Sequence, residues 1–120
     1  MKREQSKEDY LEAILQLSSD NKKVKSIDVA NKLGFSKPSV SIAMKKLRED
    51  GFIVVNRDGS LSFTEKGLLI AQKTLEKHEF LTNFFIKIGV NPAVAEVDAC
   101  EIEHGISEET FLKMKEFIKL

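Results

Sequence analysis

The sequence predicts a mainly α-helical protein with one small β-hairpin, in which a winged helix-turn-helix domain precedes an all-helical domain. Three observations support this fold class. Two short helical patterns are joined by the turn Gly-Phe-Ser at residues 34–36, an Asp-Gly pair lies between two β-rich runs, and apolar stripes at helical spacing fill the second half. We expect the first domain at residues 1–64 and the second at residues 65–120.

The first two helices are predicted from apolar residues at helical spacing. The first helix covers about residues 7–19, Ser26 is placed to cap a short second helix, and Gly34 ends it. The inward-facing residues are Tyr10, Leu11, Ile14, Leu15 and Leu17 in the first helix and Ile27, Ala30 and Leu33 in the second.

A third helix begins after Ser36 and ends at Gly51. Ser36 is its N-cap, and Pro38 falls in its first turn, where a missing N–H group costs nothing. Gly51 supplies the left-handed residue that commonly follows the end of a helix. The expected buried stripe of this helix is Val40, Met44 and Leu47.

A β-hairpin follows directly. Residues 52–56 and 60–64 are rich in β-forming residues, and Arg57-Asp58-Gly59 separates them. Asp-Gly between two such runs is a strong hairpin signal, because both residues tolerate the positive φ of a tight turn. A helix-turn-helix followed at once by a hairpin is typical of a winged helix.

Three further helices are expected after the hairpin. A long one opens at Thr64 or Glu65 and runs to Gly89, a second begins at Pro92, and Ser107 caps the last. Their apolar residues are too numerous for one small helical unit to bury, which predicts a homodimer. The residues concerned are Phe80, Phe84, Phe85, Val94, Val97, Phe111, Phe117 and Ile118.

The charge of the chain is unevenly distributed although its net charge is zero. Residues 1–64 carry a net +3 and residues 65–120 a net −3, and the stretch from Lys22 to Arg48 holds eight basic residues against Asp28 alone. Such a basic patch is expected on a surface that contacts phosphates. A solvated lysine-rich helix face is the alternative explanation.

Composition also indicates the cellular compartment of the protein. The chain has a single Cys, so no internal disulfide can form, and it has no apolar run long enough to cross a bilayer. We therefore expect a cytoplasmic protein without a membrane partner.

Cys100, Glu103 and His104 are spaced to share one face of a helix, as the ligands of helical metal sites do. Asp9 and Glu12, one turn apart on the first helix, and His78 on the long helix are further side chains that could supply ligands to the same ion. Carboxylates, imidazoles and one thiolate suit Mn(II), Fe(II), Co(II) or Zn(II) better than Mg(II) or Ca(II). Taken alone, the Cys-x-x-Glu-His pattern is a weak signal, because a lone cysteine is usually a small buried hydrophobic residue and Glu and His are common on helices.

Several motifs together resemble one family. They are EDYLEAILQL at residues 8–17, KPSVSIAMKKLREDGFI at 37–53, FTEKG at 63–67, EKHEFL at 76–81 and ACEIEH at 99–104. Their order over nearly the whole chain resembles the diphtheria-toxin-repressor family of metal-dependent transcriptional repressors, including its manganese-transport-regulator branch. The resemblance implies a winged-helix domain, a helical dimerisation domain and a divalent metal that switches affinity for double-stranded DNA at a palindromic operator.

The resemblance also implies a ligand set and a regulatory role in metal-ion homeostasis. Mn(II) or Fe(II) is the expected activating metal, with Co(II) or Zn(II) as other candidates. Cys100 resembles the thiol ligand of the iron branch, whereas the two carboxylates of the first helix resemble the manganese branch, and Thr82 replaces a carboxylate of the ancillary iron-type site. The expected ligands are Asp9, Glu12, His78, Cys100, Glu103 and His104.

The third helix is expected in the major groove, and the hairpin tip near the backbone or minor groove. Ile42 departs from the Gln that iron-type members often carry, so a base preference cannot be transferred. The expected DNA-contacting residues are Ser36, Lys37, Pro38, Ser39, Ser41, Lys45, Lys46 and Arg57.

Two alternatives remain open from the sequence. One is a winged-helix regulator without metal control, in which Glu103 and His104 are merely solvated or salt-bridged. The other is a hydrolytic metalloenzyme, but HEFLT at residues 78–82 lacks the second His of a zinc-protease motif. We therefore expect no enzymatic activity and no small-molecule substrate.

Overall fold

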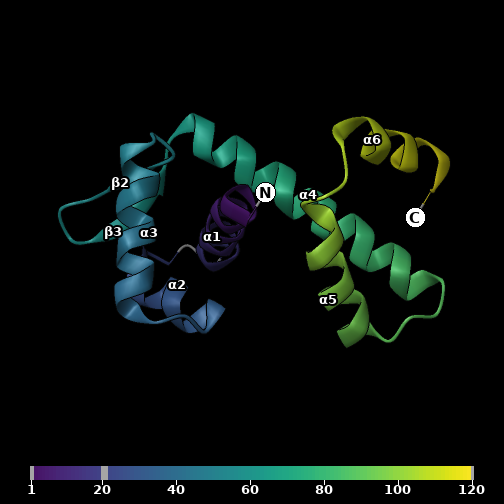
Figure 1. The fold of residues 1–120 in the computed structure, drawn as a ribbon, viewed down its shortest axis with the longest axis horizontal. Coiled ribbons are helices and arrows are strands. Elements are labelled where there is room, and N and C mark those ends of the chain that lie inside the picture. Colours follow the sequence, from purple (N-terminus) through teal and green to yellow (C-terminus); the bar gives the residue numbers. More distant parts are fainter. Residues whose placement is uncertain (1, 20–21, 120) are drawn as a thin grey trace. The chain divides into compact units, whose positions relative to one another are not determined.

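The structure is a computed structural model that describes residues 2–19 and 22–119. It contains six helices and three short strands in these residues, in the order α1, β1, α2, α3, β2, β3, α4, α5, α6 (Figure 1). They form two compact units, Met1–Gln72 and Lys73–Leu120. The mainly helical fold class with a small sheet is confirmed. The domain boundary at residue 64 stays a prediction.

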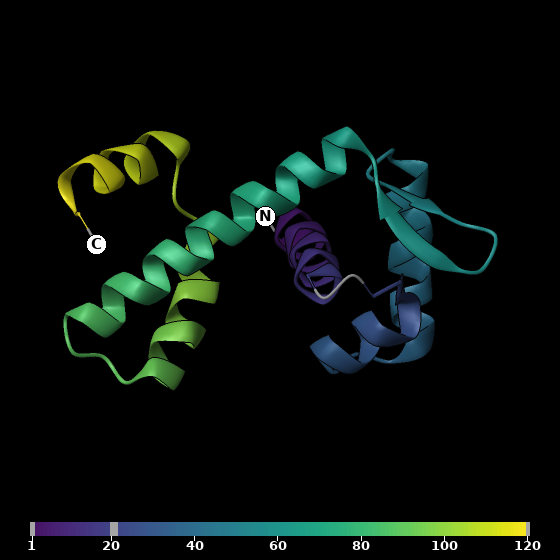
Figure 2. The same cartoon turned by 180° about the vertical axis from the view of Figure 1, so that it is seen from behind.

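Unit 1 is built on a helix-turn-helix. α1 (Lys2–Ser18) and α2 (Ser26–Leu33) pack together, and α3 (Lys37–Glu49) follows α2 after a short turn (Figure 2). Gly34 adopts a φ of 72° and its N–H donates to the carbonyl of Ala30, as a left-handed residue at a helix end should. Ser36 Oγ accepts a hydrogen bond from the Ser39 N–H, so the predicted cap of α3 is confirmed.

The start of α2 differs from the prediction. Ser26 is the first helical residue rather than the cap, and the Asp28 carboxylate accepts the Lys25 N–H at 2.9 Å. A carboxylate near a helix N-terminus also interacts favourably with the helix dipole, which favours Asp28 over a serine hydroxyl. The inward placement of Ile27 is likewise wrong: its side chain is 37% exposed, and Val29 is the residue that is fully buried.

A three-stranded antiparallel sheet completes unit 1. Strands β2 (Ile53–Val55) and β3 (Ser60–Phe63) form the predicted hairpin, in which Gly59 has a φ of 86°. A third strand, β1 (Val24–Lys25), pairs with the other side of β3, so that Lys25 lies opposite Ser60. The sheet ties the segment before α2 to the hairpin.

Unit 2 consists of the second part of α4 (Glu65–Lys87), with α5 (Pro92–Glu103) and α6 (Glu108–Phe117). Asn91 and Ser107 cap α5 and α6, each accepting a backbone N–H. The buried residues include two alanines of α5, Ala95 and Ala99, which allow close packing. Phe111 of α6 is 2% exposed and meets the Phe80 ring edge-on. No helix among residues 2–19 and 22–119 is both long and apolar enough to span a membrane.

Candidate metal centre and nucleic-acid interface

The outer face of α3 carries most of the residues predicted to contact DNA. Val40, Met44 and Leu47 are buried against the core, as predicted, which turns the opposite face of the helix outward. Ser36 is exposed, but its hydroxyl oxygen accepts the Ser39 N–H that caps the helix, and the hydroxyl also donates to Ser39 Oγ at 2.8 Å. The exposed predicted residues on α3 are Lys37, Pro38, Ser39, Ser41, Lys45 and Lys46.

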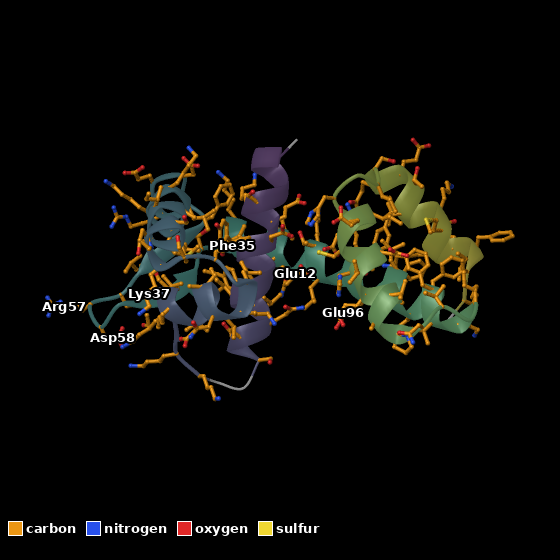
Figure 3. The ribbon with its side chains drawn as sticks, turned by 60° about the horizontal axis from the view of Figure 1, so that its bottom comes forward. Glu12, Phe35, Lys37, Arg57, Asp58 and Glu96 are labelled. Atoms are coloured by element: carbon orange, nitrogen blue, oxygen red, sulfur yellow. The ribbon has the colours of Figure 1, made fainter. Side chains whose placement is uncertain are left out.

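The tip of the hairpin carries Arg57 and Asp58 (Figure 3). Arg57 is exposed, and its contact with the DNA stays a prediction. Asp58 accepts hydrogen bonds from the N–H and hydroxyl of Ser60 and from Lys23 Nζ at 2.9 Å. The Ser60 hydroxyl, together with the Lys23 ammonium, holds the pKa of Asp58 well below its usual range, and the same contact raises the pKa of Lys23.

Lys23 is therefore a cationic residue at the hairpin that sequence reasoning missed as an individual site. Strand β1 brings it there by pairing with β3, and a strand of two residues leaves no periodicity to detect. The run of basic residues that starts at Lys22 was the signal available in the sequence.

Unit 2 gathers a buried carboxylate and two imidazoles. The Glu103 side chain is fully buried, and its Oε2 lies 3.2 Å from Nδ1 of His78 on α4. Its other oxygen, Oε1, lies 3.4 Å from Nε2 of His104. The chain turns back after α4, so that α5 returns toward the middle of that helix and meets His78 there (Figure 1).

Cys100 belongs to the same cluster. Its sulfur and one ligand atom each of Glu103 and His104 all lie within 4.8 Å of one another. Cys100 and Glu103 are one turn apart on α5. His104 was predicted to be part of this helix, but it is the C-cap that follows the last helical residue. The predicted spacing still brings all three to one place, because the chain keeps a right-handed conformation through His104.

The residues of this cluster fit a divalent metal ion. Among residues 2–19 and 22–119, neither oxygen of Glu103 accepts a hydrogen bond, and a buried carboxylate in that state is costly. Two ligand atoms that bind one ion at about 2.1 Å lie about 3.0–3.4 Å apart. The oxygen–nitrogen separations of 3.2 and 3.4 Å have this size, so one cation could bind the carboxylate and both imidazoles together.

Asp9 and Glu12 lie one turn apart on α1, in unit 1. Glu12 is 7% exposed, unusual for a glutamate, and Asp9 is partly buried. Burial, and then the nearby Asp9 carboxylate, raise the pKa of Tyr10 above its usual value. That these two carboxylates join the ligands of unit 2 stays a prediction.

Comparison with known proteins identifies the family. Residues 4–61 match the family described as iron dependent repressor, N-terminal DNA binding domain, and residues 64–119 match iron dependent repressor, metal binding and dimerisation domain. The chain belongs to the iron-dependent repressor family. This membership confirms the resemblance drawn from the sequence motifs.

Individual members of the iron-dependent repressor family align over most of the chain. An HTH-type transcriptional regulator of Methanocaldococcus jannaschii is 32% identical over 117 residues, covering 96% of this chain and 94% of that protein. The transcriptional regulator MntR of Salmonella typhimurium is 35% identical over 103 residues, covering 86% of this chain. The chain spans 66% of that MntR's length, so it is shorter than this relative.

Solved structures share the fold. The manganese regulator SloR superposes with a TM-score of 0.82 at 27% identity, and an IdeR structure from T. acidophilum with a TM-score of 0.78 at 25% identity. These matches cover 92% and 91% of this chain but only 52% of each solved chain. The predicted order, a winged-helix domain followed by an all-helical domain, agrees with this shared architecture.

Proposed function

We propose that the protein is a metal-dependent DNA-binding transcriptional repressor of metal-ion homeostasis, which Mn(II) or Fe(II) activates for operator binding. The observation that carries the proposal is the buried Glu103 carboxylate facing the imidazoles of His78 and His104. Two relatives support it by name, since one is the regulator MntR and another is the manganese regulator SloR. The exposed basic face of α3 suits double-stranded DNA as the partner.

The proposed ligands come from both units. His78, Cys100, Glu103 and His104 would bind the ion from unit 2, and Asp9 and Glu12 of α1 would add carboxylates, as the family resemblance implies. The ion supplies positive charge that neutralises these carboxylates. An ion held by ligands of both units would fix the helix-turn-helix units of a dimer so that their recognition helices fit major grooves about 34 Å apart.

The proposed role is regulatory rather than catalytic, and the proposed place of action is the cytoplasm. The family consists of repressors by description. A ligand set of carboxylates, imidazoles and a thiolate that fills the coordination of an ion leaves little room for the water or substrate that a catalytic metal keeps.

A metal titration tests the proposed function. The full chain is incubated with a random-sequence duplex library and increasing Mn(II), Fe(II) under anaerobic conditions, Co(II) or Zn(II), and bound DNA is separated and sequenced. We expect recovery of a palindromic site that requires metal and is lost on adding a chelator. Selection of the same site with and without chelator would instead support the regulator without metal control, and no retained DNA at any metal concentration would overturn the proposal.

The two lysines late in α3 are expected to contact phosphates. The combined change Lys45→Ala and Lys46→Ala should weaken binding to every duplex by a similar factor, because phosphate contacts carry no sequence information. The slope of log affinity against log salt should become shallower by about 1.8, as expected for two lost phosphate contacts. Fluorescence anisotropy at several salt concentrations measures both quantities.

A matched control for this double change is Lys87→Ala with Lys119→Ala, which removes the same charge from exposed positions of unit 2. It should leave the salt slope as in the parent. An equal flattening of the slope in both double variants would show that net charge, and not the face of α3, determines the effect.

A homodimer is the proposed assembly, because residues 64–119 match a domain described as a dimerisation domain. Unit 2 also exposes large apolar side chains, namely Ile86, Ile88, Val94, Val97, Ile102, Leu112 and Phe117. Val97 is 62% exposed, so Val97→Asp should not disturb the unit 2 core but should place a charge in the interface. In sedimentation velocity experiments we expect the parent to sediment as a dimer and Val97→Asp as a monomer.

The control for the dimer is Leu69→Asp, which adds the same charge at a 54% exposed leucine of unit 1 and should leave a dimer. A parent protein that sediments as one chain at micromolar concentration would contradict the dimer.

A further inference from the structure

Ile42 is a large apolar residue in the middle of the outer face of α3. Its side chain is 72% exposed. Helical spacing places it opposite the buried Val40 and Met44 and one turn after Pro38, which is also exposed. Ile42 and Pro38 therefore form a short apolar strip along a face whose other members are polar.

Cationic residues border this strip. Lys45 and Lys46 follow Ile42 by three and four residues, so they lie beside it on the exposed face. Lys37 precedes it at the start of the helix and is exposed as well. A single exposed apolar residue is common on protein surfaces, but an apolar strip within a basic face is suited to a polyanion that also presents apolar groups.

We propose that Ile42 is a specificity-determining residue that selects thymine by contacting its C5 methyl group in the major groove. The inference rests on the proposed DNA-binding function and adds the base that one residue reads. Among the groups that bases present in the major groove, the thymine methyl is the apolar one, and apolar side chains recognise it by contact. Isoleucine has no donor or acceptor, so it can read a base only in this way.

Replacing thymine by deoxyuracil removes only the C5 methyl and so isolates this contact. The site recovered from the random library is synthesised with each thymine replaced singly by deoxyuracil, and affinities are measured with saturating Mn(II). For the parent we expect that at one thymine in each half-site the loss of the methyl group lowers the affinity about fourfold. This factor corresponds to the free energy of burying one methylene-sized apolar group. Ile42→Ala should remove the difference between thymine and uracil at that position alone.

Leu69→Ala is the matched control, since Leu69 is an exposed leucine of unit 1 that does not lie on α3. It should keep the parental sensitivity to uracil. Circular dichroism melting checks that both variants fold. Uniform loss of affinity by Ile42→Ala for all sequences, or an unchanged uracil profile, would overturn the inference while leaving the proposed function intact. Failure of the parent to bind any duplex, with or without metal, would overturn both.

Discussion

Changing Glu103 to glutamine is expected to lower the affinity for Mn(II) on the order of 100-fold or more and to abolish metal-stimulated DNA binding. The side chain is fully buried, and its two oxygens face imidazole nitrogens at 3.2 and 3.4 Å. Glutamine keeps the size but replaces an anionic oxygen by a neutral amide group. Removing residues that only orient metal ligands already costs about 10–100-fold, so the loss of a direct ligand should cost at least as much.

Thermal unfolding gives a second readout that does not depend on DNA. A ligand present at about 100 times its Kd stabilises the folded state by about 2.7 kcal/mol, and the parent should show this gain with Mn(II). Glu103→Gln should show almost none of it at the same metal concentration. The control is Glu101→Gln, a neighbouring carboxylate of α5 that is exposed and should keep the full gain. Equal metal affinity in Glu103→Gln and the parent would exclude this cluster as the metal centre.

Local signals predicted much of the fold because their physical causes act within a few residues. Gly34 and Gly59 adopt the positive φ values expected of them, and Ser36 caps α3 as predicted. The error at the start of α2 has an equally local cause. Serine and aspartate are both common at helix N-termini, so the sequence alone did not show that Asp28 rather than Ser26 would accept the capping hydrogen bond. The periodicity of an eight-residue helix is also too short to show which of Ile27 and Val29 faces inward.

Contacts between distant segments were harder to predict. Spacing along α5 was enough to bring Cys100, Glu103 and His104 together. Spacing could not place His78 against Glu103, since that contact depends on how the chain turns after α4. His78 was a candidate ligand because it is an imidazole on the long helix, and the family resemblance supported that choice. The pairing of β1 with β3 places Lys23 beside Asp58. A strand of two residues is too short to show the alternating pattern from which strands are predicted.

Gly67→Ala is expected to destabilise unit 1 strongly, although the usual effect of this change within a helix is the opposite. Alanine normally stabilises a helix by about 0.5–1 kcal/mol relative to glycine. Here the added Cβ would lie 1.9 Å from the carbonyl oxygen of Phe52 and 2.8 Å from its carbon. No real Cβ approaches an oxygen this closely, so α4 or the segment leading into β2 must move.

The Phe52 carbonyl has little freedom to move. It accepts hydrogen bonds from the N–H and the hydroxyl of Thr64, both at 3.1 Å, and the Phe52 side chain is only 6% exposed. Its ring also lies under the ammonium groups of Lys7 and Lys66, at 4.8 and 4.4 Å from the centroid. Adding a methyl group to a tightly packed site typically lowers the free energy of unfolding by about 1–3 kcal/mol. We expect a loss near the upper end of this range, because the added Cβ clashes with backbone atoms.

The sign of the change therefore distinguishes a close backbone contact from ordinary helix propensity. For Gly67→Ala we expect the midpoint of thermal unfolding, followed by circular dichroism, to fall by about 10 °C or more. Gln72→Ala, at an exposed position later in α4, should shift the midpoint by much less. A rise of the midpoint in Gly67→Ala would mean that α4 does not approach the Phe52 carbonyl. A fall would show that this glycine lets α4 begin directly against the start of the hairpin, where a side chain of any size would separate them.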